Sequence, residues 1–304
     1  MRRVPPSPGH RNPPVTGPDA AVTGIPIVHA IVLGVVQGLS EFFPISSSGH
    51  LILVPWAFNW NEFTANSDLN KTFDVALHIG TFVGAAAYFA PDLRRFAKAG
   101  LSSIRRRRIE TTDERLAWLL LLTSIPGAAV GAGLENFIEG NLGEIWLIGV
   151  LLIAFGALLG LADRATGRRP AEEFGVKDAV VVGAVQALAL SPGVSRSGVT
   201  ITAARWLGFQ RDAAARLSFL MSLPIIGGAG LYKGAKALAG GGLPPGTGGA
   251  FAAGMAASAV TGAAAVWGTI RFVRSHSFRP FVAYRVLAGA AVLAAYFAGW
   301  RNGR

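Results

Sequence analysis

Six apolar blocks constrain what this chain can fold into. Each is close to the roughly 20 residues that cross a bilayer as a helix, and several are apolar on every face. A helix on the surface of a soluble core would instead keep one polar face. Only 15% of the residues are charged, whereas soluble domains carry about 25%. The chain is therefore predicted to be an all-α polytopic membrane protein with six transmembrane helices, over about 73–91, 115–133, 144–163, 216–239, 249–270 and 282–299.

The net charge of +11 would indicate nucleic-acid binding in a soluble protein. Here the basic residues gather between apolar blocks, as in the cluster 94–108, and this is typical of segments on the cytoplasmic side of a membrane. We therefore expect no nucleic-acid partner. The chain has no cysteine, which excludes disulfides and a cysteine nucleophile. Residues 1–24 are rich in Pro and Gly and are predicted to be a disordered tail before a single integral membrane domain over 25–304.

Two further apolar regions are too interrupted to cross a bilayer. Residues 25–58 are broken by PISSSGH at 44–50, and residues 176–209 are broken by SPGVSRSG at 191–198. Non-helical polar backbone survives at membrane depth only where protein or water surrounds it. Both regions are therefore predicted to be re-entrant helix–loop–helix hairpins.

The two broken regions also resemble each other. Aligning Gln37 with Gln186 gives an offset of 186 − 37 = 149 residues, about half the chain. The same offset pairs Gly34 with Gly183, Ser46 with Ser195, Ser48 with Ser197 and Gly49 with Gly198. Repeat one then covers about 25–163 and repeat two about 176–300, each with one hairpin and three spans. An odd number of spans leaves the chain on the opposite side of the membrane when the second copy begins, so that copy is inverted. Inverted repeats are an architecture common among transporters.

Loop charges predict the orientation of this repeat. Segments 92–114, 164–177 and 271–281 are basic and are expected inside, whereas 134–143 and 240–248 carry no basic residue and are expected outside. The first hairpin then enters from the outside, and a site built on it faces outward.

The hairpins hold the residues that indicate chemistry, because ionisable groups inside membrane segments are costly and usually functional. Arg196 has a fork of donors that suits phosphate oxygens. Glu41 is a candidate base or ligand of a hard cation such as Mg²⁺. Ser47 is a candidate nucleophile, and His50 a candidate acid, base or nucleophile. The remaining polar residues are expected to bind substrate, namely Gln37, Ser46, Ser48, Ser195, Ser197 and Thr200.

The same residues also have purely structural interpretations. Glu41 and Arg196 can form a purely structural ion pair, and Ser and Gly in membrane helices often only permit close packing. His78 either faces the site or is a satisfied core histidine. A phosphate-binding P-loop and a G-x-S-x-G nucleophile elbow are both absent. Phosphatases of the phosphatidate phosphatase superfamily need a further His and Asp after the SR segment, and SRSGVTITAARWLGFQRD has no His.

GVVQGLSEFFPISSSGHLILV at 34–54 and LSPGVSRSGVTIT at 190–202 closely resemble the BacA family of undecaprenyl-diphosphate phosphatases, as do FDVALHIGT at 73–81 and RLSFLMSLPIIGGA at 216–229. The resemblance covers most of residues 25–300. It implies an undecaprenyl-diphosphatase of the bacterial plasma (inner) membrane that regenerates the lipid monophosphate for peptidoglycan and other envelope polymers. It also implies a divalent cation, Mg²⁺ or Ca²⁺, a polyprenyl diphosphate lipid as substrate, and bacitracin resistance.

The resemblance further assigns roles. The family's E/Q-x-x-x-E motif maps onto Gln37 and Glu41, and Gln at the first position weakens any scheme that needs two carboxylates there for metal. Its catalytic His maps onto His50 and its essential Ser onto Ser47. Its PGxSRSxxT motif maps without departure onto Pro192, Gly193, Ser195, Arg196, Ser197 and Thr200.

Several alternatives stay open at this point. Either Ser47 or His50 attacks phosphorus, or one of them activates water. An inverted repeat also suits a carrier of lipid phosphate or of a small anion. The sequence leaves a homodimer open as well.

Overall fold

The computed structural model describes residues 24–60, 62, 67–239, 242–243 and 245–301, so nearly all of the predicted tail lies outside the described residues. Within them, apart from one isolated β-bridge between Arg169 and Phe209, every regular element is a helix. The helices are α1 (Ile27–Phe42), α2 (Ser47–Phe58), α4 (Ser67–Tyr88), α5 (Ala90–Arg106), α6 (Thr112–Leu122), α7 (Ser124–Asn141), α8 (Ile145–Asp163), η1 (Ala171–Glu173), α9 (Val176–Gln186), η2 (Ala187–Leu190), α10 (Arg196–Trp206), α11 (Arg211–Ala239), α12 (Gly248–Val273) and α13 (Arg279–Phe297).

The prediction of an all-α, multi-pass membrane protein is confirmed. Within the described residues, α8, α11, α12 and α13 are each long and apolar enough to cross a bilayer, and α4 with α5 forms a fifth candidate bent by 82°. The predicted block 115–133 is divided between α6 and α7 at Thr123, where the helix is interrupted. The count of six spans stays a prediction.

The basic segment 92–114 is mostly helix, so the expectation of a loop there was wrong. Its first part is α5, which turns sharply away from α4 at Phe89. The local sequence favours a helix, because a proline stands in its first turn, Asp92 lies near the positive end of the dipole and arginines lie in the last turn. The polar turns at 107–111 then lead into α6 through a capping box formed by Thr111 and Glu114.

The two hairpins agree with the predicted repeat at the level of single residues. The first helices begin at Ile27 and Val176, and the second helices begin after the serine caps Ser46 and Ser195, with the same 149-residue offset (176 − 27 and 195 − 46). Both serines have a positive φ, 79° and 74°, which is uncommon for a side chain other than glycine. Each accepts a hydrogen bond from the backbone N–H three residues later. Both regions are therefore helix–loop–helix hairpins, as predicted.

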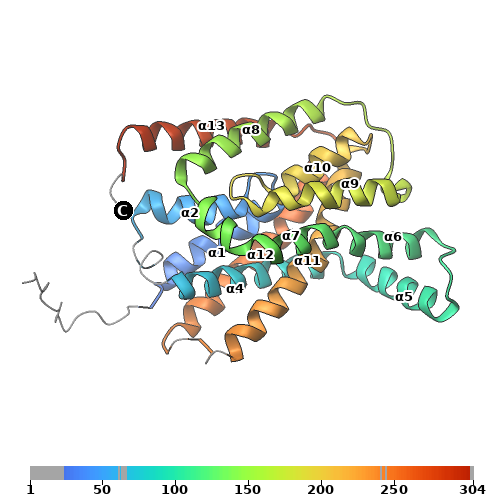
Figure 1. Ribbon diagram of the computed structural model, residues 1–304, viewed down its shortest axis with the longest axis horizontal. Helices are drawn as coiled ribbons and strands as arrows, with labels where there is room; N and C mark the ends of the chain where they lie inside the picture. Colours follow the sequence, from blue (N-terminus) through green and yellow to red (C-terminus); the bar gives the residue numbers. More distant parts are fainter. Residues whose placement is uncertain (1–23, 61, 63–66, 240–241, 244, 302–304) are drawn as a thin grey trace, which may run out of the picture.

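The hairpins approach from opposite ends of the molecule and meet at their tips (Figure 1). The Gly193 N–H donates to Ser46 Oγ at 2.9 Å, and Ser197 Oγ donates to the Phe43 carbonyl at 3.2 Å. This arrangement is what an inverted repeat requires. The position of the bilayer around it stays a prediction.

Helix α12 packs against α1 and α4 along glycine-lined contacts. A Cβ added at Gly34 would lie 2.4 Å from the Gly254 carbonyl oxygen, and one at Gly84 would lie 2.1 Å from that of Ala259. Small residues let backbones approach this closely where the hydrophobic effect does not drive helices together. These contacts hold α1 and α4 side by side, and both helices carry residues of the site described below.

Candidate active site

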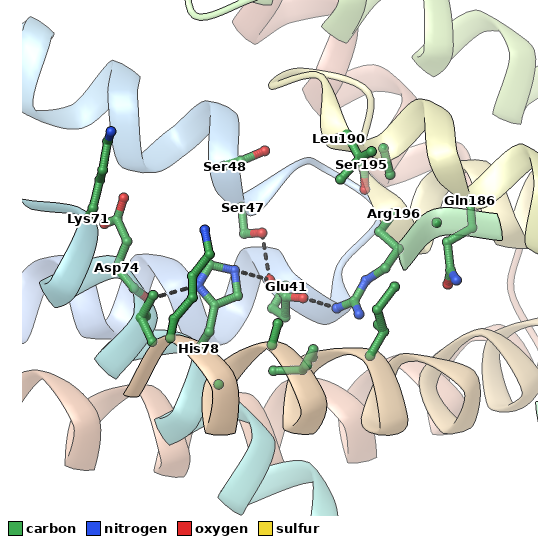
Figure 2. A pocket seen from close by; sticks show the side chains of 18 residues that line it. Glu41, Ser47, Ser48, Lys71, Asp74, His78, Gln186, Leu190, Ser195 and Arg196 are labelled. Carbon is green, nitrogen blue, oxygen red and sulfur yellow. Dashed lines mark hydrogen bonds and ion pairs between the residues drawn. The ribbon is translucent and has the colours of Figure 1, made fainter. Parts of the chain in front are cut away.

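Four side chains converge on the buried carboxylate of Glu41, and Figure 2 shows three of them, Ser47, His78 and Arg196. Gln37 Nε2 donates to Glu41 Oε2 at 3.0 Å, and Ser47 Oγ donates to the same oxygen at 2.6 Å. Arg196 forms an ion pair with Oε1, and His78 Nε2 lies 3.6 Å from Oε2. The tip-to-tip meeting of the hairpins makes this cluster possible, because Arg196 begins the second helix of one hairpin and Glu41 lies in the last turn of the first helix of the other.

A cavity of about 400 Å³ opens beside this cluster. Its wall combines both hairpins with α4, α7 and α11, and includes five of the predicted site residues: Glu41, Ser47, Ser48, Ser195 and Arg196. The cavity is thus large enough for a ligand headgroup and holds a base, a hydroxyl and a guanidinium at one place.

The other predicted binding residues lie behind the wall. Gln37 is fully buried beneath Glu41, and Ser46 and Ser197 bond to the facing loop. Thr200 Oγ1 donates to the Arg196 carbonyl at 2.7 Å and lies 2.7 Å from Ser218 Oγ. In this structure these side chains order the site and are not part of its surface.

The structure does not place His50, a predicted catalytic residue, beside Arg196. It lies outside the cavity wall, with Nδ1 2.7 Å from the Ser46 carbonyl oxygen and Nε2 2.6 Å from Tyr284 Oη. Its ring stacks on that of Tyr284, with 5.6 Å between the ring centroids. This geometry joins the first hairpin to α13. It gives His50 no contact with the other candidate catalytic groups in this conformation.

The ion pair between Glu41 and Arg196 confirms the contact that the structural interpretation expected. The pair is still accessible, because both residues line the cavity and the Arg196 side chain keeps 16% of its surface exposed. Arg196 also donates to the Ser222 carbonyl at 3.3 Å. Arg196 is therefore fixed in place while remaining able to meet an anion.

Arg285 is a site-supporting residue that the sequence reasoning missed. Its fully buried guanidinium donates to the Pro44 carbonyl at 3.0 Å, to Gly193 at 2.8 Å and to Val194 at 3.0 Å. One side chain of α13 thus binds the backbone of both loop tips. The available signal was an arginine inside the predicted span 282–299, which is a costly position for an unneeded charge.

The cavity also contains three charged residues that were not singled out, Lys71 and Asp74 on α4 and Lys233 on α11. Lys71, Asp74 and His78 follow a spacing of three and four residues, which places them on one helix face. Of the two interpretations of His78, the structure supports the one in which it faces the site.

No group of three or more His, Asp or Glu side chains in the described parts of the chain is arranged to hold a metal ion alone. Glu41 and Asp74 nevertheless both line the cavity. Mg²⁺ is commonly held by one or two carboxylates together with substrate phosphates. The donor set therefore fits a cation that arrives with a phosphorylated ligand.

Comparison with known proteins agrees with this site. The family model described as "Bacitracin resistance protein BacA" matches residues 30–291. The undecaprenyl-diphosphatase of Pelobacter propionicus is 47% identical, over 90% of this chain and 98% of that protein. The undecaprenyl-diphosphatase of Geobacter sulfurreducens is 48% identical, over 90% of this chain and 99% of that protein. The chain belongs to the BacA family.

Proposed function

We propose that this protein hydrolyses undecaprenyl diphosphate to undecaprenyl phosphate and inorganic phosphate, and so recycles the lipid carrier of peptidoglycan and envelope polymer synthesis. The observation that carries the proposal is the Ser47 hydroxyl bonded to the Glu41 carboxylate at 2.6 Å beside Arg196, in one cavity between apolar helices. The names of the relatives point to the same substrate. Removal of the diphosphate that bacitracin binds accounts for the description of the family.

Ser47 is the proposed nucleophile. Glu41 accepts the hydroxyl proton as Ser47 Oγ forms a bond to the terminal phosphorus, and the bond from that phosphorus to the bridging oxygen breaks. Undecaprenyl phosphate leaves with the bridging oxygen. Arg196 offsets the charge on the phosphate that carries the prenyl chain and on its leaving oxygen, and Ser195 and Ser48 lie on the same wall to bind the diphosphate.

Water then attacks the phosphoserine, and inorganic phosphate is released as the bond between Ser47 Oγ and phosphorus breaks. Glu41 is placed to deprotonate this water and to return a proton to Ser47. In this mechanism His50 positions the loop through Ser46 and Tyr284. Direct attack by activated water is the alternative, and it predicts that no phosphoserine can be trapped by acid quenching.

A divalent cation, Mg²⁺ or Ca²⁺, is proposed to bind with the substrate. Glu41 is the first candidate ligand and Asp74 the second, since both face the cavity. When bound, such a cation would supply Lewis-acid stabilisation of the phosphoryl oxygens.

We also propose that the protein lies in the bacterial plasma (inner) membrane with its active site facing outward. Lys71 near the beginning of α4 and Lys233 near the end of α11 mark the charged mouth of the cavity. The loop charges predict that both of these helix ends lie outside. The mouth is therefore expected to open toward the outer headgroups.

The direct test is phosphate release from undecaprenyl diphosphate by detergent-purified protein, with Mg²⁺ or Ca²⁺ and with EDTA, alongside Arg196→Ala. Release that requires the cation and falls by at least about a hundredfold in the variant is expected, because Arg196 is the guanidinium at the Glu41–Ser47 site. Absence of release from folded wild-type protein would contradict the phosphatase.

The meeting of two oppositely directed hairpins also favours a second candidate, transport of the lipid phosphate across the bilayer. Lipid exchange between leaflets of sealed liposomes that contain a non-hydrolysable diphosphate analogue tests it. Exchange no faster than in protein-free liposomes would exclude this activity.

A further inference from the structure

We propose that Lys71 and Lys233 form a second phosphate subsite at the mouth of the cavity. This subsite binds the terminal phosphate, while Arg196 binds the phosphate that carries the prenyl chain. The inference rests on the proposed function and adds to it the basis for preferring a diphosphate over a monophosphate. We call these two lysines the lysine pair.

Lys71 and Arg196 lie on opposite sides of Glu41 within the same cavity (Figure 2), and Lys233 lines that cavity as well. His78 touches Glu41, with 3.6 Å between its Nε2 and Oε2. Lys71 stands two turns before His78 on the same face of α4, about 10 Å along the helix axis. In Figure 2 the Lys71 ammonium points away from Glu41, so the subsite requires another rotamer of this long side chain, in which the ammonium reaches toward a diphosphate at Arg196.

The Arg196 side of the cavity holds the apolar wall residues Leu190, Ile225 and Gly127 beside the uncharged polar side chains of Ser195 and Gln186. A Cβ at Gly127 would lie 3.3 Å from the Ile225 side chain. Leu190 occupies the position in repeat two that Glu41 occupies in repeat one, because 190 − 41 = 149. An apolar group thus stands where the symmetry would place a carboxylate, and this end suits the first prenyl unit. The phosphate farthest from the chain then points toward the lysine pair.

The balance of charged residues in the cavity is an independent reason to expect that the lysine pair binds phosphate. Without the lysine pair, the ionised cavity residues would be Arg196 with two carboxylates, Glu41 and Asp74, and their field would repel a diphosphate. With the pair, cations outnumber carboxylates. A monophosphate held at Arg196 needs the lysine pair much less than a diphosphate does.

The plainer role for these lysines is neutralisation of Asp74, because Lys233 interacts electrostatically with that carboxylate. The two roles predict different behaviour in a double variant. If Lys233 only neutralises Asp74, then Lys233→Met has no further effect on KM in a protein that already carries Asp74→Asn. If Lys233 binds phosphate, the double variant has a higher KM than Asp74→Asn alone.

The experiment compares Lys71→Met, Lys233→Met, Asp74→Asn and the Lys233→Met/Asp74→Asn double variant with wild type, at one fixed concentration of Mg²⁺. Lys236→Met is the matched control, because Lys236 lies one turn further along α11 and outside the cavity wall. KM for undecaprenyl diphosphate is expected to rise about tenfold in each lysine variant, the size of one charged hydrogen bond. The inhibition constant of undecaprenyl phosphate should stay within about twofold, and Lys→Arg at either position should restore KM.

Three results would overturn the subsite: an unchanged KM in both lysine variants, an equal loss of affinity for the monophosphate, or a double variant whose KM equals that of Asp74→Asn. Equilibrium binding of the diphosphate and the monophosphate to detergent-purified protein gives the same comparison without turnover. A wild-type protein that binds both lipids and releases no phosphate would therefore contradict the proposed hydrolysis separately from the lysine pair.

Discussion

At the scale of single residues, the loop tip of the first hairpin places a hydroxyl against a carboxylate. Ser46 adopts a positive φ and caps α2, so Ser47 becomes the first residue of that helix. Its side chain then reaches back to Glu41 at the end of α1. A short, strained turn thus sets the distance between the proposed nucleophile and its base.

Ser47→Ala is expected to lower kcat by at least about a hundredfold, because it removes the proposed nucleophile and leaves the cavity otherwise intact. Phosphate release from undecaprenyl diphosphate at saturating substrate measures this. Ser48→Ala is the comparison variant, because Ser48 lines the same wall as a proposed binding residue, so its loss should raise KM and leave kcat near the wild-type value. A Ser47→Ala enzyme that keeps more than a tenth of wild-type kcat would contradict the assignment.

At the scale of helices, α13 holds the two loop tips together through Arg285. Arg285→Met should destabilise the protein by about 3 kcal/mol or more, because several buried carbonyls would lose their donor. Thermal unfolding in detergent measures the change, with Arg279→Met as the control at the exposed start of the same helix. Equal melting temperatures for the two variants would show that Arg285 does not organise the tips.

Close approach of α4 to α12 gives a second test at this scale. Gly84→Ala would place a Cβ 2.1 Å from the Ala259 carbonyl oxygen, so the helices must separate, at a cost of about 1–3 kcal/mol. Gly268→Ala on α12 meets nothing within 4 Å and should be neutral or slightly stabilising. Thermal unfolding of both variants in the same detergent checks this contrast. A Gly84→Ala protein as stable as wild type would rule out the tight contact.

At the scale of the whole molecule, the two hairpins enter from opposite ends, and loop charges predict which end is outside. The cysteine-free chain allows single cysteines to be placed without background. Pro245→Cys should be labelled by a membrane-impermeant maleimide in intact cells, and Thr166→Cys should be labelled only after the membrane is opened. Both positions are exposed and lie between helices. The reverse labelling pattern would place the cavity mouth on the cytoplasmic side.

Much of this architecture could be predicted from the sequence. The apolar blocks of bilayer length and the two interrupted regions are local patterns that depend only on neighbouring residues. Comparing the two interrupted regions then gives the 149-residue offset between their serines. The 149-residue offset paired Ser46 with Ser195, and the structure shows that both are helix caps. The sequence also predicted Glu41, Ser47 and Arg196 as site residues, because polar and ionisable groups within a membrane segment are costly and are usually functional.

Tertiary structure decided the remaining features, because they depend on contacts between distant parts of the chain. His50 bonds to Tyr284, which is 234 residues away, and this contact directs it away from Arg196. Arg285 reaches both loops only because α13 packs against α8. The lysine pair comes together from α4 and α11. Sequence periodicity places a residue on a helix face, but the packing of helices decides which faces meet, and with them which charged groups share a cavity.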